Sequence, residues 1–288
     1  MDLSIIIVSF NTQGLLRNCL YSVYEGLKNS PFSFEVIVVD NVSTDGTRPM
    51  LKKEFPQVRT LLNQENVGFG RANNQGIKIA KGEYILLLNS DTIVLGEALT
   101  KLLIFAKSHP HSFVGPKLLN PDRSPQTSCG PFLTLLVVFA ALFLRGDRWG
   151  LTRWSPATTR QVDWVSGAAL LGPRALFLAD LLFDEKIFMY MEELDLLYRA
   201  QKKGYLTYFY PEAQIVHLGS GSSQNKKKGP VLNIYRGLIY FYQKHHGLLA
   251  LLVLKLLLKL KARVSWFLGI LTGNSYLRET YAEAYRLV

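Results

Sequence analysis

Two rhythms of apolar residues alternate along roughly the first 110 positions of the chain. Short apolar runs predict buried strands, and between the first two runs apolar residues from Leu15 to Leu27 recur at helical spacing. This alternation is typical of βα units built around a largely parallel sheet, so we expect an α/β fold. The predicted strands are Leu3–Ser9, Phe34–Asp40, Val58–Asn63 and Glu83–Asn89.

The pattern changes in the middle of the chain. A Pro/Ser-rich stretch, Asn120–Pro131, precedes an uncharged apolar segment that ends at Leu144 and a basic region, Arg145–Arg160. We interpret residues of about 120–160 as an insertion. The later predicted elements are Val162–Leu171, a helix from about Pro173, a helix at Glu192–Lys203, strands Tyr205–Tyr210 and Gln214–His217, a loop Gly219–Gly229, and helices Val231–His246 and Leu248–Leu271.

Length and composition indicate one main domain with an appendage. The chain has 288 residues, 48% of them hydrophobic, which excludes a disordered protein. We place the main domain at residues 1–225 and a helical segment at 226–288. The two cysteines, Cys19 and Cys129, do not suggest a disulfide framework or a zinc cluster. The first apolar run stops at Phe10, too short for a signal peptide, so we expect a cytoplasmic protein.

The net charge of +11 indicates an anionic partner: a phosphorylated substrate, anionic lipid or nucleic acid. The basic residues are scattered or lie on a Leu-rich helix and lack interleaved aromatic residues, which argues against nucleic acid. On that helix Lys255, Lys259 and Arg263 repeat at i,i+4 beside a broad Leu/Val face. This geometry suits a helix lying on a membrane surface, although the same face could pack on the domain or on a second subunit as a homodimer. Its charges make it a poor spanning helix.

Polar residues follow the predicted strands at the ends where open α/β sheets bind ligands. Ser9 and Asn11 end the first strand, Asp40 ends the second, and Ser90 and Asp91 follow the fourth. A carboxylate there can bind a nucleoside or a hard cation that holds a diphosphate, but an Asp after a strand also serves as an ordinary helix cap. Gly68 and Gly70 give part of a dinucleotide fingerprint, which lacks its third glycine and follows a later strand, so an NAD-dependent enzyme is the weaker alternative.

Taken together, several motifs give the chain a resemblance to family 2 inverting glycosyltransferases of the rhamnosyltransferase-like branch, which have the GT-A fold. The segments appear in the family's order and cover roughly residues 3–220. They are Val8–Asn11, Val39–Thr47, Asn66–Gly76, Leu88–Asp91, Trp164–Ala168, Phe188–Leu196 and Val216-His217.

The resemblance implies a nucleotide-sugar site with a divalent metal, Mg²⁺ or Mn²⁺. Asp91 matches the last acid of the family's Asp-x-Asp motif, whose first acid is Asn89 here, and His217 matches a histidine that completes metal binding in some members. His217 could equally be an ordinary histidine near a strand end. The residues that the resemblance assigns to the nucleotide sugar are Val8, Ser9, Asn11, Asp40, Asn66, Gly68, Asn73, Ser90 and Asp91.

Glu193 matches the catalytic base, which would remove a proton from the acceptor hydroxyl as that hydroxyl attacks the anomeric carbon. A helix N-terminus should favour its ionised form. First-turn acids also pair with the helix dipole in ordinary proteins, and the Trp164 turn could serve packing alone. We expect donor or acceptor to be lined by Trp164, Ser166, Gly167, Glu192 and Asp195.

The resemblance further implies transfer of a sugar to a lipid-linked saccharide or a cell-surface polysaccharide precursor, with L-rhamnose from dTDP-rhamnose as the first candidate donor. A UDP- or GDP-sugar donor is the alternative. The insertion would then lie on the acceptor side, and the protein would sit peripherally on the inner face of the cell membrane.

Overall fold

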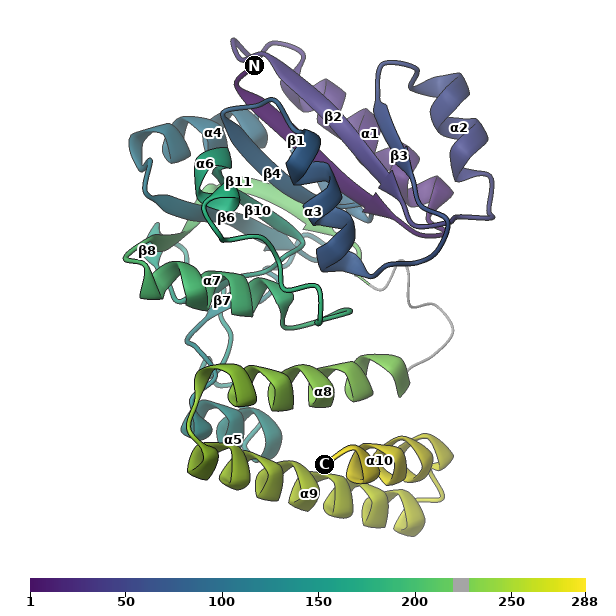
Figure 1. The fold of residues 1–288 in the computed structure, drawn as a ribbon, viewed down its shortest axis with the longest axis vertical. Helices are drawn as coiled ribbons and strands as arrows, with labels where there is room; N and C mark the ends of the chain where they lie inside the picture. The colour runs from purple at the N-terminus through teal and green to yellow at the C-terminus, as the bar shows by residue number, and fades with distance from the viewer. Residues whose placement is uncertain (220–227) are drawn as a thin grey trace.

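The computed structural model describes residues 1–219 and 228–288. Its described part contains a nine-stranded mixed sheet with helices on both faces and a separate two-stranded sheet (Figure 1). The strands are β1 (Leu3–Ser9), β2 (Phe34–Asp40), β3 (Arg59–Leu62), β4 (Tyr84–Asn89), β5 (Thr92–Val94), β6 (Ser112–Leu119), β7 (Cys129–Gly130), β8 (Arg160–Gln161), β9 (Trp164–Val165), β10 (Ala169–Pro173) and β11 (Leu206–His217). The helices are α1 (Gln13–Leu27), α2 (Thr47–Glu54), α3 (Phe69–Ile79), α4 (Ala98–Ser108), α5 (Leu135–Phe143), α6 (Arg174–Leu178), α7 (Glu192–Lys202), α8 (Lys228–His245), α9 (Leu248–Leu271) and α10 (Ser275–Leu287).

The sheet order is β3-β2-β1-β4-β10-β6-β11-β5. The first four of these strands in the sheet run parallel, as the βα rhythm predicts, and β1 and β2 have the predicted bounds. Strand β10 then pairs antiparallel with β4 and with β6. The parallel strands therefore end at the edge where β10 begins, and this edge collects the polar residues that follow β1, β2 and β4.

Four elements differ from the sequence-based expectation. The predicted strands Tyr205–Tyr210 and Gln214–His217 form the single strand β11, whose register against β6 shifts between Tyr210 and Gln214. The helix expected from Pro173 is the five-residue α6. Helix α10 was not predicted, and the apolar stretch of the insertion forms the short helix α5.

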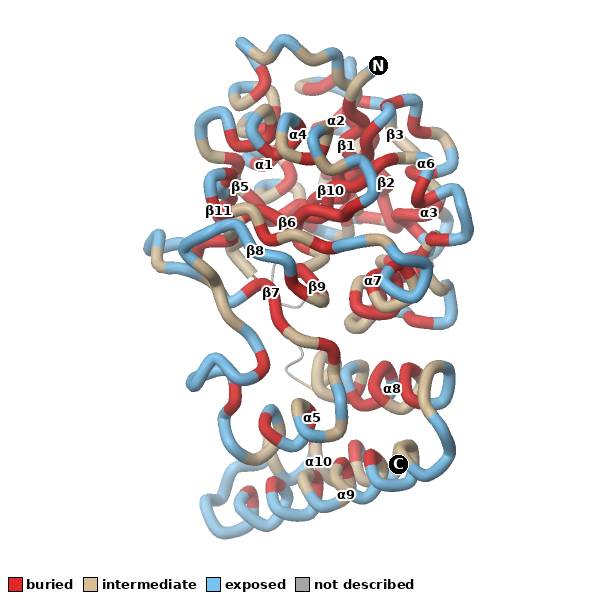
Figure 2. The backbone as a smooth tube through the Cα atoms, turned by 90° about the vertical axis from the view of Figure 1, so that its left-hand side faces the viewer, coloured by how far each residue is buried: buried red, intermediate tan, exposed pale blue. Residues whose placement is uncertain are grey.

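The core has two parts, one on each face of the sheet (Figure 2). On one face, Leu16 and Leu20 of α1 and Leu102 of α4 belong to the same buried cluster as Ile5 and Ile7 of β1. On the other face, the core continues from the sheet through α6 and α7 into the C-terminal helices. Its members include Ile6, Phe177, Leu197, Leu238, Leu254 and Ala284.

Helices α8, α9 and α10 form a layer beside the α/β part, and α5 packs against α9 within it (Figure 1). The Tyr242 hydroxyl donates to the Leu133 carbonyl at 2.7 Å, which ties α8 to the segment leading into α5. The boundary expected between residues 225 and 226, and most of the loop Gly219–Gly229, lie outside the described residues. Among the described helices, none combines the length and apolar character that a membrane crossing needs.

Candidate active site

The carboxyl ends of β1 and β4 are joined by hydroxyl groups. Thr12 Oγ1 lies 3.0 Å from Ser9 Oγ and 3.1 Å from Ser90 Oγ. Val8 pairs with both Val39 and Asn89 in the sheet, so it lies between the ends of β2 and β4. The polar residues predicted at the ends of β1, β2 and β4 therefore lie at one edge of the sheet.

Asp40 is fully buried at the end of β2. Its carboxylate accepts a hydrogen bond from Arg48 Nε at 2.6 Å and one from the Ser43 amide at 3.3 Å. Asn11, which has a positive φ of 52°, accepts from the Thr44 amide at 2.8 Å and so fixes the loop after β2 against the end of β1. Arg48 was not singled out from the sequence, where its only signal is its place in the helix that follows Asp40.

The segment before α3 meets the segment before α7 at Gly68. Asn66 Oδ1 accepts from the Gly68 amide at 3.0 Å, and the Asn73 side chain donates to the Phe69 carbonyl at 3.0 Å. Gly68 has φ +85°, and a Cβ there would lie 2.7 Å from the Phe188 carbonyl oxygen. Glycine is required here because both the backbone angle and this close approach exclude a side chain.

Asp91 and His217 are brought together by the pairing of β5 with β11. His217 Nε2 lies 3.4 Å from Asp91 Oδ1 and 3.5 Å from Asn89 Nδ2. The other ring nitrogen, Nδ1, lies 2.8 Å from Gln126 Oε1, and the Gln126 amide also donates to the His217 carbonyl at 3.3 Å. We assign the ring proton to Nδ1, because Nδ1 can then donate it to Gln126 Oε1. Nε2 is then unprotonated and could bind a cation together with Asp91. Gln126 had no signal in the sequence.

A divalent cation fits this pair only with help from its substrate. Carboxylate oxygen and imidazole nitrogen are suitable ligands for Mn²⁺, and carboxylate oxygen for Mg²⁺. Among the described residues no group of three His, Cys, Asp or Glu side chains is placed to hold a metal. Oxygen atoms of a bound diphosphate would have to complete the coordination.

Glu193 reaches the same region through the turn between β9 and β10. The Gly167 amide donates to Glu193 Oε1 at 3.5 Å, and the next residue, Ala168, accepts from the Asn89 amide at 2.9 Å. The Ser166 hydroxyl accepts from the Ala168 amide at 3.3 Å and closes this turn. The turn therefore joins the half-buried base candidate to the end of β4.

The electrostatics of Glu193 differ from the expectation that the helix N-terminus favours its ionised form. Burial raises the pKa of Glu193, and the amides of Gly167 and Leu194 only partly oppose this, so the helix terminus does not dominate. Burial raises the pKa of Glu192 well above its ordinary value, and repulsion from Glu193 adds to the effect. Glu192 Oε2 is buried without a hydrogen-bond partner among the described residues. A raised pKa makes Glu193 a stronger base once it is ionised.

The residues before α7 have a constrained backbone. Tyr190 and Met191 both have positive φ, 68° and 75°, which is unfavourable for residues with long side chains. Helix α8 supports them closely: a Cβ at Gly237 would lie 2.7 Å from Met191 Cγ. The start of α7, and with it Glu193, is thus held in place by the C-terminal layer.

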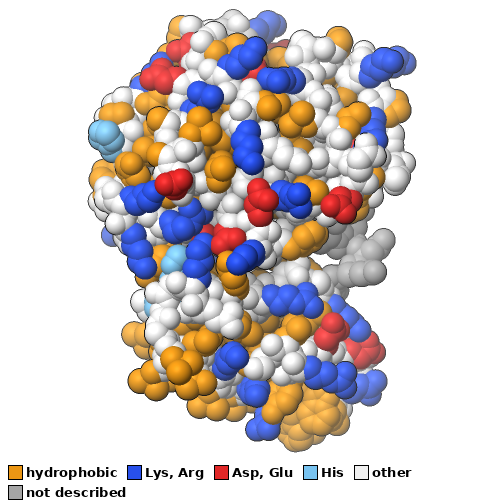
Figure 3. Space-filling model, viewed as in Figure 1, with side chains coloured by type: hydrophobic (Ala, Val, Ile, Leu, Met, Phe, Trp, Pro, Cys, Tyr) orange, Lys and Arg blue, Asp and Glu red, His pale blue; other side chains and the backbone are white. Residues whose placement is uncertain are grey.

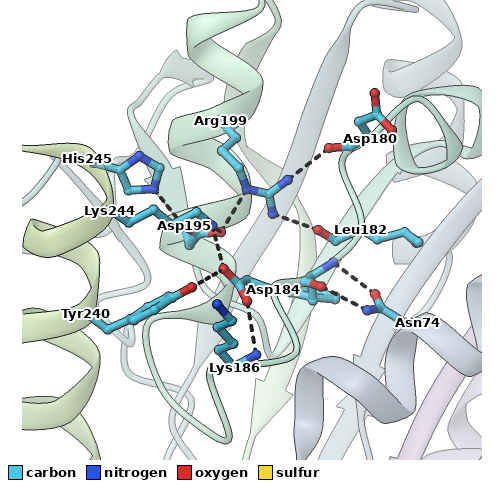
Figure 4. A network of polar contacts seen from close by, with 11 residues as sticks. Asn74, Asp180, Leu182, Asp184, Lys186, Asp195, Arg199, Tyr240, Lys244 and His245 are labelled. Carbon is cyan, nitrogen blue, oxygen red and sulfur yellow. Dashed lines mark hydrogen bonds and ion pairs between the residues drawn. The ribbon is translucent and has the colours of Figure 1, made fainter.

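Asp195 lies in an ion cluster that joins α7 to α8 (Figure 4). Its fully buried carboxylate contacts Arg199 Nε at 2.8 Å, Lys244 Nζ at 2.8 Å and His245 Nε2 at 2.7 Å. Lys244 also contacts Asp184 at 2.7 Å. Burial acts to raise the pKa of Asp195, but Lys244 and His245 outweigh it and lower the pKa overall. These contacts give Asp195 a bracing role between the two helices.

Trp164 contacts the insertion. Its indole donates to the Pro131 carbonyl at 2.8 Å, and the Arg153 guanidinium lies over its ring at 5.5 Å. A cavity of about 300 Å³ lies beyond it, between α7, α8 and the start of α5. Tyr198, Phe241 and His246 line this cavity, and none of the predicted site residues does.

Known proteins show similarity to this chain in sequence and in fold. Residues 4–126 match the family described as Glycosyl transferase family 2. The N-acetylglucosaminyl-diphospho-decaprenol L-rhamnosyltransferase of Mycobacterium tuberculosis is 33% identical over 204 residues, which cover 63% of this chain. The matched region spans 66% of that enzyme's length, slightly under two thirds.

Two solved structures share the fold. S. aureus TarS matches with a TM-score of 0.55 and 17% identity, covering 99% of this chain and 89% of its own. GalNAc-T7, solved with UDP, GalNAc and Mn²⁺, matches with a TM-score of 0.59 and 17% identity, covering 84% of this chain and 50% of its own. The expected GT-A architecture is confirmed by these similarities.

Proposed function

The chain belongs to glycosyltransferase family 2, and from this premise we propose that it is an inverting enzyme acting on a nucleotide-sugar donor with Glu193 as base. One observation carries the proposal: the turn at Gly167 and Ala168 joins Glu193 to Asn89, two residues before Asp91. The candidate base and the candidate diphosphate site thus lie at one edge of the sheet.

The proposed reaction is a single displacement at the anomeric carbon. The acceptor hydroxyl oxygen forms the new bond to that carbon while the bond to the diphosphate oxygen breaks, and the hydroxyl proton passes to a carboxylate oxygen of Glu193. Asp91 and His217 would hold a divalent cation, which neutralises the departing diphosphate when bound. Ser9, Asp40 and Asn66 would bind the nucleoside. Thr12 contacts the Ser9 hydroxyl, Arg48 contacts the Asp40 carboxylate, and the Gly68 amide donates to Asn66.

For the donor we propose dTDP-L-rhamnose, with a UDP- or GDP-sugar as the alternative. The support is the mycobacterial relative, whose name specifies rhamnosyl transfer to a diphospho-decaprenol acceptor. For the acceptor we propose a lipid-linked saccharide or a cell-surface polysaccharide precursor at the inner face of the membrane. The basic and apolar composition of the insertion and the C-terminal layer supports such an acceptor.

A thermal-shift screen tests the donor. The protein is heated with dTDP-, UDP- and GDP-sugars, each with Mg²⁺, with Mn²⁺ and with a chelator. Binding to the folded state raises the melting temperature by mass action, so we expect stabilisation by dTDP-rhamnose that is lost with the chelator. Stabilisation by NAD, with no effect of any nucleotide sugar, would contradict the proposal.

A further inference from the structure

Helices from two distant parts of the chain expose apolar side chains on the outer side of the C-terminal layer (Figure 3). Helix α9 turns Leu254, Leu258 and Ala262 inward, and these are fully buried. Its opposite side is exposed, with exposed fractions of 77% at Leu249 and 67% at Leu256. We call the exposed apolar side chains of α9 and α5 the docking face. Its members include Leu136, Phe139, Leu249, Leu252, Leu256, Leu260 and Phe267.

Helix α5 joins this face because it packs directly on α9 (Figures 1 and 2). The Lys261 ammonium of α9 lies over the Phe143 ring of α5 at 5.9 Å. Leu136 on α5 is 77% exposed. An apolar surface this large is unusual for a chain that acts alone in water, and it requires a partner.

The charges beside the face indicate what that partner is. Lys255, Lys259 and Arg263 follow one another at four-residue intervals along one flank of α9, and neither α5 nor α9 contains an acidic residue. The charged groups of Lys259 and Arg263 lie over the Tyr285 ring at 5.6 and 5.0 Å, beside the docking face. A second copy docked through this face would find no carboxylate on α5 or α9 to pair with these cations.

We propose that the docking face binds the surface of a bilayer containing anionic phospholipid, with the apolar side chains in the interface and the basic flank against the headgroups. The inference deepens the proposed function and rests on it for the lipid-linked acceptor. Helix α8 lies between α9 and α7 (Figure 1). Through Gly237 and Lys244 it links the surface that meets the bilayer to the helix that carries Glu193.

Vesicle flotation tests the inference. The full chain is mixed with vesicles of phosphatidylcholine, with and without phosphatidylglycerol, and the bound fraction is measured. We expect binding that is strongest with phosphatidylglycerol, and about tenfold or more weaker for L252E/L256E. The control is I104E, because Ile104 is an apolar residue of α4 that is 55% exposed away from this face. I104E should bind as the unsubstituted protein does.

A second variant separates the two contributions. K255Q/K259Q should lose the preference for phosphatidylglycerol while keeping its binding to neutral vesicles. Binding that L252E/L256E leaves unchanged would overturn the inference, as would a dimer in sedimentation that the same substitution dissociates. Donor binding is read independently by thermal shift, so a protein that binds nucleotide sugar but no vesicles refutes this inference alone.

Discussion

At the scale of single residues, Glu193 is the side chain on which the proposed chemistry depends. We predict that Glu193→Gln lowers kcat by about 10²–10⁴-fold, because the amide cannot accept the acceptor proton. The substitution keeps size and burial, so nucleotide-sugar stabilisation in the thermal-shift assay should persist. A variant with near-normal turnover would remove Glu193 from the mechanism.

Glu193 also predicts how the rate of sugar transfer depends on pH. Burial raises the pKa of Glu193 above its ordinary value of 4.5, and only the ionised carboxylate can act as a base. Transfer should therefore decline, as the pH is lowered, at a pH above 4.5. A pH profile of kcat/KM checks this, and a profile that stays flat down to pH 4.5 would contradict it.

Asp91 and His217 should differ in importance. In the proposed site the Asp91 carboxylate would supply the negative charge that holds a cation, while His217, whose ring contacts Gln126, would add a neutral ligand. We predict that Asp91→Ala abolishes transfer and that His217→Ala or Gln126→Ala reduces it by about 10–100-fold. Titration with Mn²⁺ should partly rescue the two milder variants. Normal activity of Asp91→Ala would contradict the assignment.

Glu192 gives a prediction for stability. Its folded-state pKa is raised above the ordinary 4.5, so its burial as an anion destabilises the fold as the pH rises from 4.5 through the folded pKa. Glu192→Gln should therefore be more stable than the unsubstituted protein at neutral pH, by about 1 kcal/mol or more, and no more stable near pH 4. Urea unfolding at both pH values measures the difference. An advantage that grows toward acid pH would have the wrong sign.

At the scale of elements, the ion cluster between α7 and α8 should contribute to stability. Lys244 contacts both Asp184 and Asp195, and Asp195 is fully buried. Lys244→Met should lower the free energy of unfolding by about 1–3 kcal/mol, less than for an isolated buried pair, because Arg199 and His245 still face Asp195.

Lys203→Met is the matched control for this change. Lys203 lies 3.9 Å from Asp180, whose side chain is 95% exposed, so its loss should cost less than about 0.5 kcal/mol. Urea unfolding of both variants measures the two costs. Equal costs would show that the cluster does not brace the two helices.

For some helices and strands, the local apolar pattern was sufficient to predict the bounds of the element. Strands β1 and β2 and helix α9 have the predicted bounds because their apolar residues recur with the period of the element. Strand β11 continues through Pro211 with a shifted register against β6. There the pairing with β6 overrides the local break that the proline produces in the sequence.

At the scale of the whole molecule, the positive charge and the exposed apolar docking face should both contribute to vesicle binding. The chain carries a net charge of +11, and its basic flank lies beside the docking face. Raising the salt concentration should weaken binding to anionic vesicles by about tenfold, because exposed charges are screened within roughly 10 Å at 0.1 M salt. Binding to phosphatidylcholine alone should change little. Flotation at two salt concentrations measures both, and a salt-independent preference for anionic lipid would contradict the electrostatic part.

The sequence by itself determined the fold family and the identity of most candidate residues. A parallel sheet places residues after its strands at one edge, so Ser9, Asp40 and Asp91 could be predicted from strand order alone. The motifs from Val8 to His217 indicated the GT-A architecture because their residues and order resemble those of family 2 glycosyltransferases.

Only the tertiary structure decided how these residues are held. Three side chains contact the predicted site residues: Arg48, Gln126 and Lys244. These contacts form only when the segments that carry them pack together, so no spacing in the sequence predicts them. The raised pKa values of Glu192 and Glu193 follow from burial, which outweighs the helix terminus that the sequence does show. The docking face likewise needed the structure, because α5 and α9 are distant in the chain and become one surface only when they pack together.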